Sequence, residues 1–299
     1  LLLLVLTTSF IRQSWNLGVS FLCFWLFWEL FTDGINAIIW ADNADLKLYI
    51  YCDIVTHLQM FTFIVKPACT LLITRRLYRI VSLRSVLLHS RKESLTDHIV
   101  EWTIGFGLPV LVTSVFYYIQ QGARFQVLEG FGCRNTYNIS GFSIITVDSW
   151  AVILPSISIF FYCPKMIYVF YHHSRDTNKF LRSDSSVSRP SYFRLLALAC
   201  VDIILTLPYG IANVVEQVNG LLPGYSVPFF WGWESTHSNW MPFSISYAEI
   251  KAGGGWQLSN FYLSSWSSVA LALITFAFFG ATPEARAAYQ RGFYAISKP

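Results

Sequence analysis

The chain has 299 residues, of which 54% are hydrophobic and only 13% are charged. Soluble globular domains carry about 25% charged residues, so this composition excludes an ordinary water-soluble domain. The net charge of +4 is small, and nucleic-acid binding is therefore not inferred from it.

Seven apolar stretches follow one another along the chain. Spanning the hydrocarbon core of a bilayer takes roughly 20 mainly apolar residues in a helix. Six stretches are long enough, at 16–40, 49–73, 102–120, 144–168, 195–217 and 259–280. The stretch at 1–11 covers only about half of a hydrocarbon core at ~1.5 Å per residue, and we interpret it as a truncated first helix. A signal peptide would need a basic start and a small-residue cleavage site, and the sequence has neither.

The Lys and Arg residues predict the orientation. With the connection after the first helix inside, sixteen of the 21 Lys and Arg residues fall on the inner side. Cytoplasmic connections carry this excess of positive charge, so the N-terminus is predicted outside and the C-terminus inside. The sequence therefore predicts one all-α domain over 1–299, a seven-helix transmembrane bundle.

Two further segments lie outside the spans. The outer connection at about 218–258 is long and Trp-rich, which is typical of a segment that rests on the membrane interface or covers a pocket. After the last span, Thr282 is expected to cap a short helix at about 283–293 that lies along the inner surface.

Two of the six cysteines are predicted to form a disulfide. Cys52 begins the third helix at its outer end, and Cys133 lies in the second outer loop, so both face the oxidising side. The other four fall within apolar spans, where a small buried thiol is the usual interpretation. Asn138 in the same loop starts an Asn-Ile-Ser glycosylation triplet, a pattern that also occurs often by chance.

Charged residues inside the spans require partners or a water-filled cavity. Glu29, Asp33 and Asn36 are spaced four and then three residues apart, so they share one face of the second helix. Lys66 and Asp202 lie at comparable depths, and we expect them to pair. Such groups either fix helix contacts or take part in a switch, and the sequence leaves both open.

Other candidates lie near the two ends of the bundle. Asp53, His57 and Asp148 are at the outer mouth, where they face a ligand or are merely hydrated loop-end residues. Pro208 interrupts the sixth helix and is a candidate pivot, although packed membrane helices also tolerate proline without moving.

Enzyme signatures are absent from the sequence. It contains no paired-His zinc spacing, no nucleophile elbow and no phosphate-binding Gly loop. No catalytic activity, cofactor or metal site is therefore predicted.

Eight short motifs are spread over the chain: INAIIW at 35–40, YCDI at 51–54, PAC at 67–69, RRLY at 75–78, FGC at 131–133, YFRLL at 192–196, LP at 207–208 and TPEAR at 282–286. Together they resemble the fungal receptors for lipidated mating pheromones of the a-factor type. Their order along the chain makes the set more specific than any single motif.

The resemblance implies a receptor in the plasma membrane, without catalytic activity, that binds a farnesylated peptide and activates a heterotrimeric G protein. The expected peptide contacts are Asp33, Asn36, Asp53, His57, Asp148, Trp231 and Trp233. The expected G-protein contacts are Arg75, Arg76, Tyr78, Arg79 and Arg194, although positive inner loops are also needed for topology and attract anionic lipid. Lys66 and Asp202 would hold the resting state. The alternative is a small transporter or channel that uses the intramembrane acids, against which the sequence shows no internal repeat.

Overall fold

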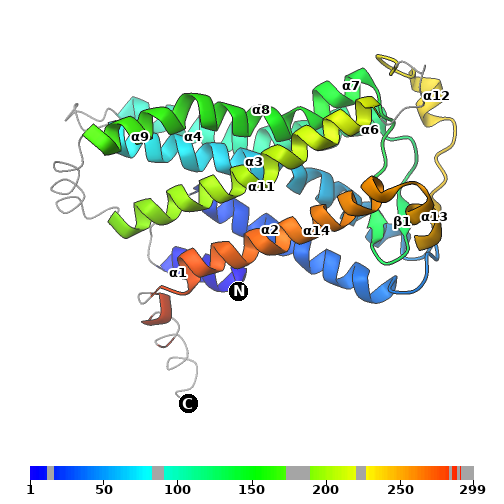
Figure 1. Cartoon of the computed structure of the whole chain (residues 1–299), viewed down its shortest axis with the longest axis horizontal. Helices are drawn as coiled ribbons and strands as arrows, with labels where there is room; N and C mark the ends of the chain where they lie inside the picture. The colour runs from blue at the N-terminus through cyan, green and yellow to red at the C-terminus, as the bar shows by residue number, and fades with distance from the viewer. Residues whose placement is uncertain are drawn as a thin grey trace.

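The computed structural model is a bundle of long helices whose outer end carries a small sheet (Figure 1). It describes residues 1–11, 17–82, 91–172, 189–219, 227–282, 285–287 and 290. The helices of the first half are α1 (Leu2–Ile11), α2 (Leu17–Ile39), α3 (Tyr49–Ser82), α4 (Arg91–Trp102), α5 (Leu108–Leu111) and α6 (Tyr117–Gln120). Those of the second half are α7 (Gly141–Ser143), α8 (Trp150–Ile157), α9 (Cys163–His172), α11 (Arg189–Asn219), α12 (Trp233–His237), α13 (Tyr247–Ala252) and α14 (Gly255–Thr275).

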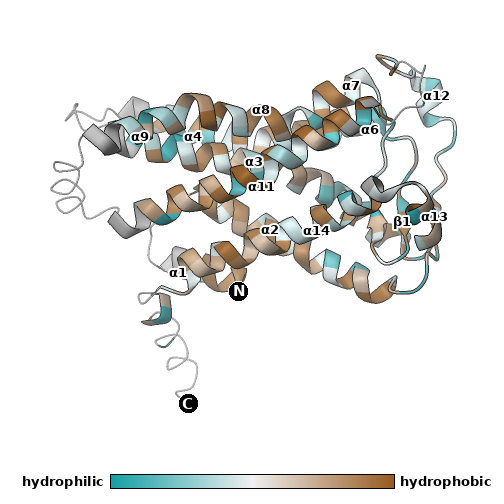
Figure 2. Ribbon diagram, in the orientation of Figure 1, coloured by the Kyte–Doolittle hydropathy of each residue, from teal (hydrophilic) through white to brown (hydrophobic). Residues whose placement is uncertain are grey.

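Within the described residues, five helices are long and apolar enough to cross a membrane, and a sixth is counted if a bent pair forms one span. The five cover Leu17–Ile39, Tyr49–Arg79, Leu95–Gln120, Phe193–Val215 and Leu258–Gly280. The bent pair, Gly141–Asp148 and Trp150–Met166, meets at 43°. Apolar residues run along the helices, and hydrophilic residues are frequent at the end that carries α12 and α13 (Figure 2). A helix satisfies its own backbone hydrogen bonds, which makes this architecture suitable for a lipid environment.

Two of the spans contain π-helical turns near prolines. The turns η2 (Thr103–Gly107) and η3 (Val112–Phe116) flank Pro109, and η4 (Ile144–Asp148) and η5 (Ser158–Tyr162) flank the helix that contains Pro155. A proline has no N–H and removes one i→i−4 hydrogen bond, so the neighbouring turns rearrange. A fifth π-helical turn among the described residues, η6 (Phe276–Gly280), continues α14 to the end of the last span.

The third helix is the centre of the bundle. In an apolar stretch of 18 residues within its span, 72% of the residues are buried inside the protein, against 17–33% for the corresponding stretches of the other four unbent spans. The main core cluster gathers buried residues from α1, α2, α3, α9, α11 and α14, among them Leu22, Cys69, Leu198 and Leu271. A helix that contacts neighbours on every side is well placed to connect polar groups from several spans.

The sequence predicted an all-helical bundle, and the outer end adds three short strands. They are β1 (Gln126–Leu128), β2 (Gly132–Arg134) and β3 (Phe243–Ile245), in the order β2-β1-β3. Val127 pairs with Cys133 in the antiparallel hairpin and with Ser244 in the parallel pair. The Trp-rich outer connection is therefore tied to the second outer loop by backbone hydrogen bonds.

The predicted inner-surface helix lies partly outside the described residues. Ala285 donates its backbone N–H to the Thr282 hydroxyl at 3.0 Å, and Arg286 donates its N–H to the Thr282 carbonyl at 2.9 Å. These are the contacts of an N-cap residue with a first helical turn.

Candidate functional site

A disulfide and two side-chain amides hold the outer hairpin against the bundle. Cys52 at the start of α3 is bonded to Cys133 on β2, with Cα atoms 5.3 Å apart. The Cys133 carbonyl also accepts a hydrogen bond from Gln59 on α3 at 2.9 Å and one from Asn36 on α2 at 3.5 Å. Strand β2 is therefore fixed relative to two helices, and Asn36 holds the hairpin in place.

A cavity of about 390 Å³ lies beneath this hairpin. Its walls come from α2, α3, α11 and α14, from β1 and β2, and from the loop that follows β2. They include Glu29, Lys66, Arg134, Tyr137, Gln217 and Asn260. A cavity in this range is large enough for a small-molecule or peptide segment.

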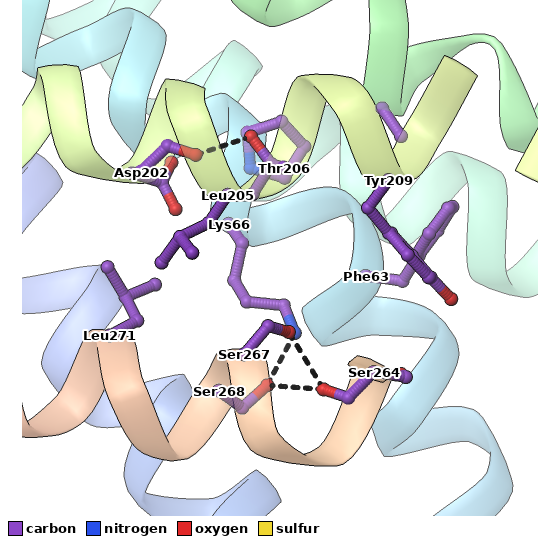
Figure 3. A pocket seen from close by; sticks show the side chains of 12 residues that line it. Phe63, Lys66, Asp202, Leu205, Thr206, Tyr209, Ser264, Ser267, Ser268 and Leu271 are labelled. Atoms are coloured by element: carbon purple, nitrogen blue, oxygen red, sulfur yellow. Dashed lines mark hydrogen bonds between the residues drawn. The ribbon is translucent and has the colours of Figure 1, made fainter. Parts of the chain in front are cut away.

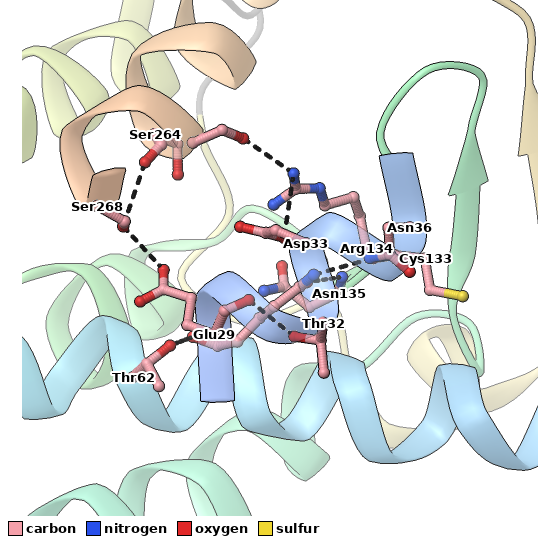
Figure 4. Close-up of polar contacts among 12 residues, drawn as sticks. Glu29, Thr32, Asp33, Asn36, Thr62, Cys133, Arg134, Asn135, Ser264 and Ser268 are labelled. Atoms are coloured by element: carbon pink, nitrogen blue, oxygen red, sulfur yellow. Dashed lines mark hydrogen bonds and ion pairs between the residues drawn. The ribbon is translucent and has the colours of Figure 1, made fainter. Parts of the chain in front are cut away.

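The acidic stripe on α2 faces the bundle, as its spacing predicted. Glu29 and Asn36 are buried, and Asp33 is half-buried. Arg134 on β2 lies 3.7 Å from the Asp33 carboxylate, and it donates a hydrogen bond to Ser265 on α14 at 3.1 Å (Figure 4). Arg134 thus connects the outer hairpin to two helices on the rim of the cavity.

The predicted ion pair between Lys66 and Asp202 is wrong. The Lys66 ammonium lies 2.9 Å from the Glu29 carboxylate and donates a second hydrogen bond to Ser268 on α14 at 2.9 Å. Asp202 on α11 instead accepts a hydrogen bond from the Thr70 hydroxyl on α3. Lys66 extends toward α14, away from the Asp202 carboxylate (Figure 3). Matching depth along two helices could not reveal that Glu29 offers the nearer acceptor.

A second, smaller cavity of about 40 Å³ lies next to Lys66 and Asp202. It shares Lys66, Phe63, Tyr209 and Ser264 with the larger cavity. The two spaces therefore meet at the Lys66 side chain. Pro208, the candidate pivot, is inside α11 one residue before Tyr209, and its own side chain is exposed.

Asp53 and His57 do not line either cavity. Asp53 receives two hydrogen bonds from Arg124 in the second outer loop, at 2.9 and 2.6 Å. These hydrogen bonds raise the pKa of Arg124 above its ordinary value. His57 is exposed and contacts the Tyr117 ring edge-on, with centroids 5.5 Å apart. Both residues belong to the outer rim on another face of α3.

Asp148 is buried behind the cavity wall. It accepts hydrogen bonds from the Tyr137 hydroxyl at 2.8 Å and from the Asn213 amide at 3.3 Å, and both of these donors line the cavity. Burial, followed by the nearby Asp148 charge, raises the pKa of Tyr137 well above its ordinary value. Tyr137 therefore remains a protonated donor, and Asp148 orients two wall residues.

The two predicted Trp contacts also lie outside the cavity walls. The Trp231 indole N–H donates to the Ile139 carbonyl at 2.8 Å. Trp233 on α12 stacks on His237 with centroids 4.0 Å apart, and both rings contact Tyr118 at the end of α6. These aromatic groups tie the third outer loop to the fourth span and remain partly exposed.

At the inner end, two of the predicted arginines are already paired. Arg75 lies 2.8 Å from the Asp97 carboxylate on α4, and Arg79 forms an ion pair with the same group. The Tyr78 ring contacts the Tyr162 ring at 5.6 Å and lies beneath the Lys165 ammonium at 5.3 Å. The remaining predicted contacts, Arg76 and Arg194, are half-buried.

Sequence reasoning missed most of the cavity walls. Arg134 follows Cys133 directly, so the predicted disulfide was a signal that its neighbour is held against the bundle. The wall amides carried no such signal, because a neutral Asn or Gln is common in loops and at helix ends.

The predicted glycosylation residue, Asn138, is half-buried, and its side chain lies where a Cβ on Gly122 would be.

No group of three or more His, Cys, Asp or Glu side chains suited to a metal ion occurs in the part of the chain that the structure describes.

The walls of the larger cavity offer hydrogen-bonding groups and a few charges, which are suited to binding a ligand by polar contacts. The fold and the cavity together define an integral membrane protein of the helical-bundle class with a polar cavity at its outer end.

Comparison with known proteins supplies the family. Residues 1–297 match the pheromone A receptor family, and the chain belongs to this family. It is 30% identical over 284 residues to the pheromone B alpha 3 receptor of Schizophyllum commune, which covers 93% of this chain and 43% of that protein. It is 26% identical over 293 residues to pheromone receptor 2 of Mycosarcoma maydis, which covers 95% and 80% of the two chains.

The chain spans less than half the length of the Schizophyllum receptors that it matches over most of its own length. No solved structure matches it. The family is one of membrane receptors, in agreement with the apolar spans and with the resemblance noted in the sequence.

Proposed function

We propose that this chain is the transmembrane part of a plasma-membrane receptor that binds a farnesylated peptide pheromone and activates a heterotrimeric G protein. Its relatives are named as pheromone receptors, and the family match covers almost the whole chain. The single observation that supports ligand binding most is the polar cavity of about 390 Å³ beneath the disulfide-bonded outer hairpin. The family match also favours a receptor over the alternative, a transporter or channel.

In this proposal the predicted ligand residues fall into two groups. Asp33, Asn36 and Asp148 act through the wall residues that they orient, namely Arg134, the hairpin and Tyr137. The other group, at the outer rim, contacts the ligand as it enters and consists of Asp53, His57, Trp231 and Trp233. The exposed apolar helix faces and membrane lipid receive the farnesyl chain.

Activation follows from differential binding. A ligand shifts a receptor toward its active arrangement only when it binds that arrangement more tightly. Lys66 lies at the boundary of the two cavities and contacts α2 and α14, so a ligand in the larger cavity reaches a group that connects several spans. Glu29, Asp202 and Pro208 are the neighbouring groups through which the change would pass to α11.

The test uses the full-length receptor in a reporter yeast challenged with synthetic farnesylated peptides. Arg134→Ala removes a charged donor from the cavity rim, so we expect potency to fall by about ten-fold, the effect of losing one hydrogen bond to a charged group. The matched control is Lys251→Ala, which removes an exposed cation of the outer side that does not line the cavity. Unchanged potency for alanine variants of Arg134, Asp33 and Asp148, with normal surface expression, would exclude the cavity as the binding site.

The inner contacts have a separate test. Arg75, Arg76, Tyr78, Arg79 and Arg194 are proposed to contact the G protein, with Asp97 released from Arg75 and Arg79 in the active state. Charge reversal at Arg75 and Arg76 is expected to abolish signalling while ligand binding and membrane insertion persist. Normal G-protein activation by that variant would remove these two residues from the proposed interface.

A further inference from the structure

Neutral amide side chains dominate the polar walls of the larger cavity. Six of them line it, from α3, β1, α11 and α14 and from the residue that follows β2. In chain order they are Gln59, Gln126, Asn135, Asn213, Gln217 and Asn260. Each amide offers one carbonyl acceptor and one NH₂ donor. A peptide backbone offers the complementary pair of groups at every residue other than proline.

The charges in the same cavity compensate one another. Glu29 and Lys66 lie 2.9 Å apart, and Arg134 lies 3.7 Å from Asp33. A charged ligand group would have to separate one of these pairs, and leaving the other partner buried without compensation is costly. The arrangement therefore favours a neutral ligand group.

Some of the amides hold the wall together, and others have unused oxygens. Gln59 uses both ends of its amide, because its NH₂ donates to the Cys133 carbonyl and its oxygen accepts from the Asn135 N–H at 3.3 Å. In contrast, the oxygens Gln217 Oε1 and Asn260 Oδ1 are buried without a partner. Gln217 is only 7% exposed, on α11, and Asn260 is on the neighbouring α14.

Such atoms require a donor. A buried acceptor that lacks a hydrogen bond loses the hydration it had in the unfolded chain and gains nothing in return. Gln217 and Asn260 lie on two different helices that both border the cavity, so a rotation of either amide side chain would present its oxygen to a ligand N–H group there. A hydrocarbon chain in the same place would leave both oxygens unsatisfied.

We propose that the larger cavity binds the uncharged backbone of a peptide ligand through Gln217 and Asn260, and that the lipid of that ligand binds outside this cavity. This inference rests on the proposed function, because it takes the ligand to be a lipidated peptide. It specifies which part of the ligand enters the cavity and which atoms receive it.

The experiment is a double-mutant cycle between the receptor and its ligand. The most potent synthetic farnesylated peptide is resynthesised with one backbone amide N-methylated at a time, which removes a single N–H donor. At one or two positions we expect N-methylation to lower potency about ten-fold on the wild-type receptor. On Gln217→Leu or Asn260→Leu the same methyl group should cost no further potency.

Gln120→Leu provides the matched control. Gln120 is also a buried glutamine with an unpartnered Oε1, but it lies on α6 and does not line the cavity. The full ten-fold loss on N-methylation should persist in this variant. Surface labelling of each receptor verifies that it is folded and exported, and Asn260→Leu keeps the test available if Gln217→Leu is not exported.

A second arm varies the lipid. The same peptide carrying a farnesyl, a shorter prenyl or a methyl group is compared on the wild type and on Gln217→Leu. If the lipid binds elsewhere, the substitution lowers potency by the same factor for all three peptides.

A factor that grows with lipid length would place the hydrocarbon in the cavity and overturn the inference. N-methylation without coupling to either residue would also overturn it. Failure of every peptide to activate the wild-type receptor would overturn the proposed function as well, so the two failures are distinguishable.

Discussion

The outer end of the molecule and the middle of the bundle are held together by different kinds of interaction. At the outer end, a disulfide between Cys52 and Cys133 and the backbone ladder of β2-β1-β3 define one arrangement. In the middle, a single ammonium, that of Lys66, lies in a small cavity that is also lined by Asp202, while it pairs with Glu29.

In the proposed receptor, this difference would separate ligand binding from the response to it. The outer end is rigid because exchanging its covalent and backbone bonds would require unfolding. The middle depends on side chains that have more than one acceptor within reach, so a second arrangement needs only a change of partner. A receptor benefits from both, since a rigid rim reduces the entropy cost of binding and a rearrangeable centre allows a population shift.

The largest effect is expected from breaking the central pair. Lys66→Met leaves the buried Glu29 carboxylate without its counter-charge, which is expected to cost about 3 kcal/mol of stability. This value is at the low end of the range for broken buried ion pairs, because both side chains line a cavity and are therefore less completely desolvated. Thermal unfolding of the purified receptor in lipid nanodiscs would measure it. The double variant Lys66→Met with Glu29→Gln should recover most of the loss, and failure to recover would show that the two residues are not coupled.

Removing the disulfide is expected to have the next largest effect. Cys133→Ser opens a link across 81 residues, and disulfides of this kind contribute about 2–4 kcal/mol. Surface expression and thermal stability should both fall. Cys200→Ser is the control, because Cys200 is a free, exposed cysteine. Equal behaviour of the two variants would mean that the hairpin does not depend on the covalent link.

Two glycines of the hairpin sharpen the comparison further. Gly130 and Gly132 have φ of 81° and 73°, a region that is strained for residues with a Cβ. A Cβ on Gly132 would lie 2.6 Å from the Asn36 side chain, whereas a Cβ on Gly130 would meet nothing within 4 Å. We expect Gly130→Ala to cost about 1 kcal/mol and Gly132→Ala about 2 kcal/mol or more. Equal melting temperatures for the two variants would argue against close packing of the hairpin on α2.

The smallest effect on stability is expected at the inner end. Asp97→Asn removes the counter-charge of Arg75 and Arg79 but keeps an amide oxygen that can accept a hydrogen bond, so we expect a cost of only about 0.5–1 kcal/mol. If Arg75 and Arg79 contact a G protein as proposed, basal reporter activity should nevertheless rise, because the variant frees both arginines for that contact. A variant with unchanged basal activity would indicate that Asp97 does not restrain the inner end.

The sequence by itself predicted the membrane-crossing helices and the partners of the disulfide, and it supplies the prediction for the orientation of the bundle. These follow from local composition: apolar runs of about 20 residues, the placement of Lys and Arg, and the positions of Cys52 and Cys133 relative to the spans. The acidic face of α2 also followed from the spacing of Glu29, Asp33 and Asn36, since helical periodicity alone places them on one side.

Only the tertiary structure decided which polar groups meet. Depth along the helices suggested Asp202 for Lys66, but the rotation of α2 and α14 around α3 brings Glu29 and Ser268 closer. The parallel pairing of β1 with β3 and the gathering of Gln217 and Asn260 at one cavity depend likewise on segments far apart in the chain. Such contacts are set by the packing of whole helices, and a sequence pattern records the face of each helix without recording which neighbour that face meets.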